Sequence, residues 1–136
     1  MGRARRQGID HASINAILAQ VKTLLKRYIE TGKPGVIDMK QMPRMNAATY
    51  GYLKEIMARG EVSAVVENES RILISETEYP GIWWVIHHND KGEPVTELLE
   101  ICAFPEILAS HVADMREGCR RLERLLTEKR SPIIAN

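Results

Sequence analysis

The chain has 136 residues, the length of one ordinary domain. It carries 19 Lys and Arg against 18 Asp and Glu, and this net charge of +1 gives no overall attraction for nucleic acid. The hydrophobic fraction of 44% and the charged fraction of 27% are typical of a globular domain with its own core. No apolar run approaches the ~18 residues of a membrane span, so we expect neither nucleic acid nor membrane as a partner.

The N-terminal residues are basic but do not make an export signal. Arg5-Arg6 is a twin arginine, yet Asp10 follows where a signal peptide requires an uncharged apolar stretch. The simplest interpretation is a mobile basic tail. We predict a tail over residues 1–9, a single domain over residues 10–130 and a second tail over residues 131–136.

The two cysteines indicate the compartment. Cys102 and Cys119 form no CxxC pair and no disulfide framework. Free thiols are typical of a reducing cytoplasm, so we predict a cytoplasmic protein. The first interpretation of each cysteine is a small buried hydrophobic residue.

Residues 11–30 carry apolar side chains at steps of three and four, which predicts an amphipathic helix. Either Asp10 or Ser13 can cap its N-terminus. Gly32 and Pro34 follow where a helix must end.

A second helix is expected from Asn46, as the cap, to about Ala58. Gly60 suits a left-handed position after its last turn. The residues between the two helices are irregular, and Val36 to Met39 are interpreted as a short extended piece.

The hydrophobic period then changes from 3.6 to 2, which predicts strands joined by short turns. Turn residues at Asn68-Glu69, Pro80-Gly81 and 89–92 separate the apolar runs. The expected strands cover residues 62–67, 71–75, 82–88 and 95–104.

The last element is predicted to be one long amphipathic helix. Pro105 stands at the first helical position, and the pattern continues to about Lys129. Its apolar residues recur in alternating steps of four and three: Leu108, Val112, Met115, Cys119, Leu122 and Leu126.

The predicted fold is α+β, a four-stranded antiparallel β-meander packed with about three helices in the order α-α-β-β-β-β-α. The third strand is apolar on both faces, since Trp84 and Trp83 point in opposite directions. One face meets the helices. The other needs its own cover, which the first helix, a second copy of the chain or a different protein can supply.

No catalytic constellation accompanies the polar residues. Glu76 and Glu78 share a strand face, with Glu97 and Glu100 near in sequence, but neither a nucleophile nor an oxyanion donor is evident. A solvated strand face explains these carboxylates, and a hydrolase that uses Glu76 and Glu100 ranks last. We predict a protein that is not an enzyme and needs no cofactor.

An ordered set of short motifs lies between Gly60 and Ile107. The motifs are Gly60-Glu61-Val62, Glu76-Thr77, Pro80-Gly81-Ile82-Trp83-Trp84-Val85, Leu99-Glu100-Ile101 and Pro105-Glu106-Ile107. In this order they resemble the C-terminal conserved region of the hydrogenase expression/formation protein HupH family, to which proteins called HyaF and HoxQ are related.

The resemblance implies an accessory protein in the maturation of nickel–iron hydrogenase. It implies a non-catalytic chaperone or scaffold for the small-subunit precursor, which carries the iron–sulfur clusters, before twin-arginine export. The two-faced strand beside the Pro-Gly turn suggests where the partner binds, because aromatic side chains supply large contact areas. The predicted partner-binding residues are Glu76, Thr77, Pro80, Gly81, Trp83 and Trp84.

Two alternatives remain open. One is a metal or iron–sulfur carrier in the same pathway that uses Cys102, Cys119 and His111, although core packing is the commoner role of such residues. The other is a generic homodimeric interaction module, in which a second copy covers the spare apolar face.

Overall fold

The structure is a computed structural model that describes residues 8–128. The chain divides into two compact units, Met1–Pro105 and Glu106–Asn136, which are described in turn. Apart from Gly8 and Ile9, the predicted tails at 1–9 and 131–136 lie outside the described residues.

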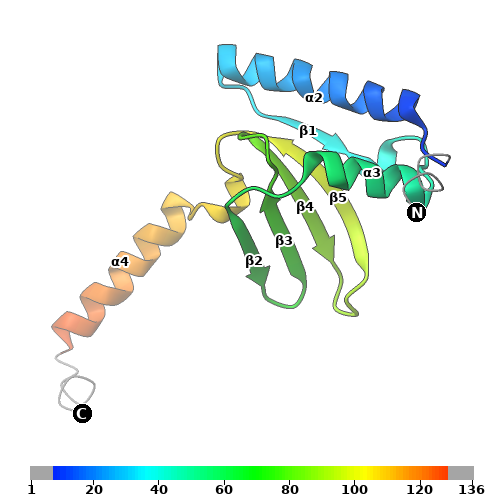
Figure 1. Cartoon of the computed structure of the whole chain (residues 1–136). Helices are drawn as coiled ribbons and strands as arrows, with labels where there is room; N and C mark the ends of the chain where they lie inside the picture. The colour runs from blue at the N-terminus through cyan, green and yellow to red at the C-terminus, as the bar shows by residue number, and fades with distance from the viewer. Residues whose placement is uncertain (1–7, 129–136) are drawn as a thin grey trace. The chain divides into compact units, whose positions relative to one another are not determined.

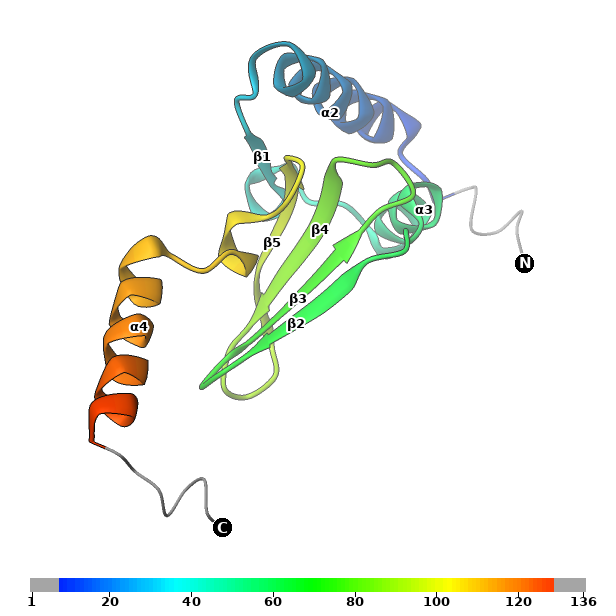
Figure 2. The same cartoon turned by 90° about the vertical axis from the view of Figure 1, so that its left-hand side faces the viewer.

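The first unit places two helices against a five-stranded antiparallel sheet (Figure 1). The strand order is β1-β5-β4-β3-β2, so β4 lies at the centre. The β2–β3 and β4–β5 turns lie at the end of the sheet that is remote from the helices (Figures 1 and 2). The elements are α2 (His11–Thr31), β1 (Gly35–Asp38), η1 (Met39–Gln41), α3 (Ala47–Met57), β2 (Ser63–Glu67), β3 (Arg71–Glu76), β4 (Ile82–His88) and β5 (Pro94–Ile101).

The α+β prediction is confirmed, but the sheet has one strand more than the four expected. The extra strand is β1, which pairs with β5 and brings Ile37 opposite Leu99. Four residues are too few to show a convincing alternation, and the partner strand lies some sixty positions later in the chain. Pairing across such a distance leaves no local signal in the sequence.

Local capping follows the sequence. The Asp10 carboxylate accepts a hydrogen bond from the Ser13 backbone N–H at 3.1 Å, so Asp10 rather than Ser13 caps α2. The Asn46 side chain accepts from the Thr49 N–H at 2.8 Å and caps α3. Gly32 ends α2 in the left-handed conformation with φ 74°.

The end of α3 differs from the prediction. The residue with positive φ is Ala58, at 56°, and not Gly60. Gly60 is required for a different reason: a Cβ atom there would lie 2.5 Å from the Thr77 carbonyl oxygen. The Gly60 N–H also donates to the Glu76 carbonyl at 2.7 Å, so the chain passes too close to β3 for a side chain.

One face of the sheet packs against α2 and α3. Ile82 and Trp84 on β4 are buried there, together with Leu99 and Ile101 on β5. The helices contribute Ile14, Ile17 and Val21 from α2 and Leu53 and Met57 from α3.

The opposite face of β4 is also buried, as Trp83 and Val85 show. The Trp83 indole N–H donates to the Cys102 carbonyl at 3.0 Å, and the Phe104 ring packs edge-on against Trp83. For Trp83 the cover is therefore the chain directly after β5. From the sequence we expected the first helix, a second copy or another protein as the cover, and not this segment.

The second unit contains η2 (Glu106–Leu108) and α4 (Val112–Thr127). The predicted single helix from Pro105 is therefore wrong at its start. His111 has an extended backbone, with φ −76° and ψ 144°, and occupies the N-cap position of α4. Leu108 fits the apolar period but belongs to the separate 3₁₀ turn, which periodicity does not distinguish from an α-helix.

Replacing Gly60 with Ala should lower the free energy of unfolding by about 2 kcal/mol, because the added methyl group meets backbone rather than a flexible side chain. Denaturant unfolding measures the change. Gly51 is the matched control, since a Cβ atom there meets nothing within 4 Å. Gly51→Ala should stabilise α3 by about 0.5–1 kcal/mol, and equal effects at both positions would contradict the close approach.

Candidate functional site

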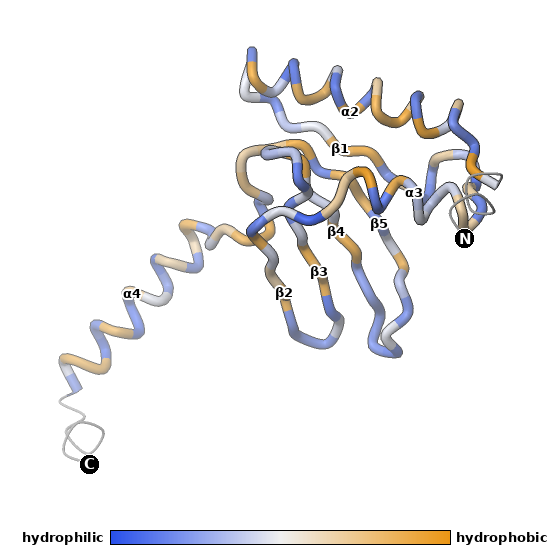
Figure 3. The backbone as a smooth tube through the Cα atoms, in the orientation of Figure 1, coloured by the Kyte–Doolittle hydropathy of each residue, from blue (hydrophilic) through white to orange (hydrophobic). Residues whose placement is uncertain are grey.

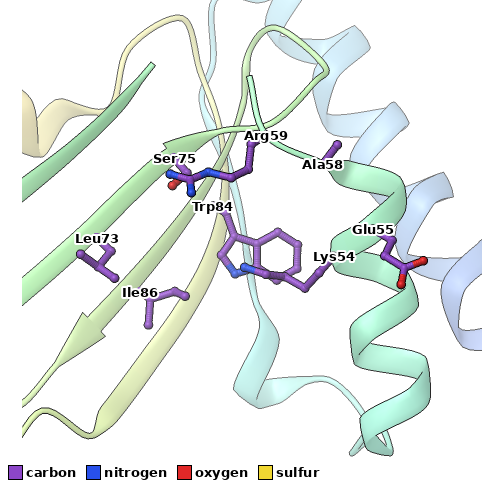
Figure 4. Close-up of a pocket in the computed structure, with 8 residues that line it drawn as sticks. All are labelled: Lys54, Glu55, Ala58, Arg59, Leu73, Ser75, Trp84 and Ile86. Atoms are coloured by element: carbon purple, nitrogen blue, oxygen red, sulfur yellow. The ribbon is translucent and has the colours of Figure 1, made fainter. Parts of the chain in front are cut away.

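A cleft of about 460 Å³ lies between α3 and the central strands (Figure 4). One wall is the last turn of α3 and the residues that follow it. The floor is formed by β3 and β4 on the face that the helices cover. The lining residues are Lys54, Glu55, Ala58, Arg59, Leu73, Ser75, Trp84 and Ile86.

Trp84 forms the aromatic part of the floor. The Lys54 ammonium nitrogen lies 4.2 Å from the centre of the Trp84 ring, a cation–π contact. The Tyr50 ring packs edge-on against the same indole, with the centroids 6.1 Å apart. Trp84 itself is only 4% exposed, so it shapes the cleft and offers little surface of its own.

Glu97 on β5 holds these aromatic residues in place. One of its carboxylate oxygens accepts hydrogen bonds from the Tyr50 hydroxyl at 2.5 Å and from the Trp84 indole N–H. Burial raises the pKa of Tyr50, and the hydrogen bond to Glu97 raises it further. The phenol therefore remains a donor throughout the physiological pH range.

Both cations of the cleft, Lys54 and Arg59, are exposed overall, and the Lys54 side chain lies against the Trp84 ring. Burial lowers the pKa of Lys54, while the Glu97 carboxylate acts in the opposite direction. Figure 4 shows the Arg59 guanidinium over Ser75 and the Glu55 carboxylate pointing away from Trp84. The cleft thus presents two positive groups above an apolar and aromatic floor.

The apolar surface continues beyond the cleft toward the edge strand. Leu73 and Ile86 lie opposite each other on β3 and β4, and Val65 on β2 is the cross-strand partner of Leu73. Val65 is 49% exposed. An occupant of the cleft can therefore extend across β3 to β2.

The β3–β4 connection is held by its own motif residues. Thr77 is buried, and its hydroxyl donates to the Ile82 carbonyl at 2.9 Å and accepts from the Tyr79 N–H at 3.2 Å. Gly81 has φ 89°, which favours glycine. These two residues build the turn, and Tyr79 and Pro80 stand exposed on it.

The six predicted partner-binding residues do not form one surface. Glu76 and Trp83 are cross-strand partners on the sheet face opposite the helices. Thr77, Pro80 and Gly81 lie in the β3–β4 connection. Trp84 lies on the helix-covered face and lines the cleft.

The residues on the α3 side of the cleft were not among those predicted from the sequence. Tyr50 and Lys54 are spaced i, i+4, so they share one face of α3, and this spacing was a usable signal. Glu97 was noted only as one of several acidic residues. Its pairing with Tyr50, forty-seven positions away, depends on the fold.

The residues of the carrier hypothesis are divided between the units. Cys102 is buried in the first unit, and His111 and Cys119 are exposed in the second. Burial raises the pKa of Cys102, which disfavours the thiolate that binds metal. Among residues 8–128, no three His, Cys, Asp or Glu side chains are grouped so that they could hold a metal ion.

Within the part of the chain that the structure describes, no helix is both long enough and apolar enough to cross a bilayer.

Replacing Glu97 with Gln should lower the pKa of the Lys54 ammonium further, because the carboxylate is the group that favours its charged form. An NMR titration of the lysine side chains measures the change. Glu93→Gln in the β4–β5 loop is the control, since Glu93 bonds the Asn89 side chain there. An unchanged Lys54 titration in Glu97→Gln would contradict the electrostatic link between the two residues.

Three kinds of similarity to known proteins agree. The family model described as "HupH hydrogenase expression protein, C-terminal conserved region" matches residues 12–128. The hydrogenase expression/formation protein HupQ of Azotobacter chroococcum is 29% identical over 99 residues, which are 73% of this chain and 34% of that protein. The corresponding HoxQ of Azotobacter vinelandii is 29% identical over 98 residues, 72% of this chain and 34% of its own length.

A solved structure is similar as well. The hydrogenase expression protein HupH from Thiobacillus denitrificans superposes with a TM-score of 0.79 and 27% sequence identity, over 85% of this chain and 95% of that one. The chain spans about a third of the length of the curated relatives it matches. With a family model that covers 12–128 and a shared fold, the chain belongs to the HupH hydrogenase expression protein family.

Proposed function

We propose that this chain acts in the maturation of nickel–iron hydrogenase as a non-catalytic chaperone or scaffold that binds the small-subunit precursor. The names of its relatives describe hydrogenase expression and formation, which supports the pathway. The cytoplasm, where a precursor is held before export, is the proposed location. No cofactor is part of the proposal.

The observation that carries the binding role is the cleft beside α3. Lys54 and Arg59 face it from the helix side, and Leu73, Trp84 and Ile86 form an apolar floor. Such a lining suits a peptide segment that combines an apolar side chain with a carboxylate. We therefore propose that the precursor contributes a segment of this composition.

The β3–β4 connection is proposed as a second contact. Tyr79 and Pro80 are exposed there, and Glu76 is half-buried beside them. The turn and the strand end behind this contact are held in place by the Thr77 hydroxyl, the Gly81 backbone and the Trp83 indole N–H. In this proposal the six predicted residues act together: Glu76 and Pro80 at the surface, and the other four beneath it or in the cleft.

Co-purification with the hydrogenase subunits tests the function. The chain is expressed with the small-subunit precursor, and separately with the large subunit, and the retained protein is quantified. Selective retention of the small-subunit precursor is the expected result. Retention of neither subunit, or of the large subunit alone, would contradict the proposed partner.

Charge reversal at Arg59 tests the cleft. Arg59→Glu places a carboxylate against the proposed carboxylate of the precursor, and the affinity should fall about thirtyfold. Lys91→Glu makes the same charge change in the exposed β4–β5 loop and should leave binding unchanged. Thermal unfolding of each variant shows whether the fold is intact, and equal binding by both variants would remove the cleft from the proposal.

A further inference from the structure

Helix α4 carries a continuous apolar seam that no other described element of the second unit covers. Figure 3 shows hydrophobic and hydrophilic residues alternating turn by turn along the helix. Leu122 is 63% exposed and Leu126 is 76% exposed. The seam, with steps of three and four residues, consists of Val112, Met115, Cys119, Leu122 and Leu126.

Steps of three and four repeated over two heptads are the pattern of a helix that pairs with another helix. An isolated helix of 16 residues is marginal in water and gains most of its stability by packing its apolar side. In the described part of the second unit, the other regular element is the three-residue η2. The seam therefore needs an occupant.

We propose that the occupant is α4 of a second copy of this chain, packed antiparallel in a two-fold symmetric helix pair. The first argument is charge. Arg116 and Glu123 lie on the same edge of the seam, each directly after a seam residue. They are seven residues apart, about 10 Å along the axis, which is too far for an ion pair within one helix.

An antiparallel helix pair brings these two charges together by symmetry. A two-fold axis perpendicular to the helices brings like edge against like edge, so Arg116 of each copy meets Glu123 of the other. A parallel pair would bring this charged edge against the opposite edge, which carries Gly118 and Leu125. The charge pattern is therefore self-complementary in the antiparallel arrangement.

The second argument is shape, and it comes from that opposite edge. Gly118 lies in a shallow groove of about 570 Å³, with Cys119, Leu122 and Leu125 among its lining residues. A Cβ atom on Gly118 would meet nothing within 4 Å, so packing within the second unit does not explain a glycine that weakens the helix. In the antiparallel pair, Leu125 of the second copy lies over Gly118.

The charged edge and the Gly118 groove select the same register of the two helices. Suppose that Cys119 of one copy lies beside Leu122 of the other. The partners in each Arg116–Glu123 pair and in each Gly118–Leu125 pair are then offset along the helix axis by less than one turn. Met115 then lies beside Leu126 of the second copy. This inference does not depend on the proposed hydrogenase function and stands or falls separately from it.

Sedimentation velocity over a range of concentrations tests the pair on the full chain. We expect a reversible monomer–dimer equilibrium, because a seam of two heptads is short. Leu122→Glu should abolish the dimer, since it places a charge in the seam. Leu122 lies in the second unit and both tryptophans of the chain lie in the first, so the tryptophan fluorescence of the folded first unit should be kept.

Charge exchange distinguishes the antiparallel register from other modes. Arg116→Glu alone and Glu123→Arg alone should each raise the dimer dissociation constant about tenfold, because each variant creates two like-charged contacts. The double variant Arg116→Glu with Glu123→Arg should restore the original constant. Arg124→Glu is the control for the same charge change, since Arg124 contacts Glu117 on the outer side of the helix.

Gly118→Leu separates helix stability from pairing. The substitution should increase the helicity of α4 and yet weaken the dimer, because the added side chain fills the place of Leu125 from the second copy. A chain that stays monomeric at every concentration would overturn the proposal. So would a dimer that Leu122→Glu leaves intact, a charge exchange without recovery, or a Gly118→Leu variant that dimerises more tightly.

Discussion

Strand β4 is buried on both faces, and the rest of the first unit is arranged around this constraint. Its two adjacent tryptophans point in opposite directions, so each indole N–H needs an acceptor inside the protein. Trp84 donates to the Glu97 carboxylate on the helix side, and Trp83 donates to the Cys102 carbonyl on the other. The first bond places the Glu97 carboxylate of β5 under α3. The second bond requires the chain after β5 to fold back over the sheet.

The cleft results from the hydrogen bond that Trp84 donates to Glu97. Glu97 also accepts from Tyr50, which ties the middle of α3 to β5 and β4. The same helix therefore covers the β4–β5 half of the sheet and leaves Leu73 and Val65 less covered. Lys54 and Arg59 project over the uncovered strip, so one carboxylate under the helix determines where two cations stand beside an apolar floor.

The second unit is not built around a buried strand. Its helix has no core of its own in the described residues, and its sequence carries instead an exposed seam with complementary edges. Family membership connects the chain to hydrogenase expression, while the cleft and the seam offer two separate surfaces. A scaffold that pairs with itself through one surface and holds a precursor segment with the other would use both.

The sequence by itself determined the features whose physical cause is local. Asp10 and Asn46 begin their helices and Gly32 ends one, through bonds and dihedrals within four residues, and the alternation in β2 and β3 shows in each strand alone. The ordered motifs also identified the family. Strand β1, the acceptor role of Glu97 and the cover of Trp83 were decided only by tertiary structure, because each joins residues far apart in the chain. The opposite directions of Trp83 and Trp84 follow from strand alternation and could be predicted from the sequence, whereas only packing decided what each face of β4 meets.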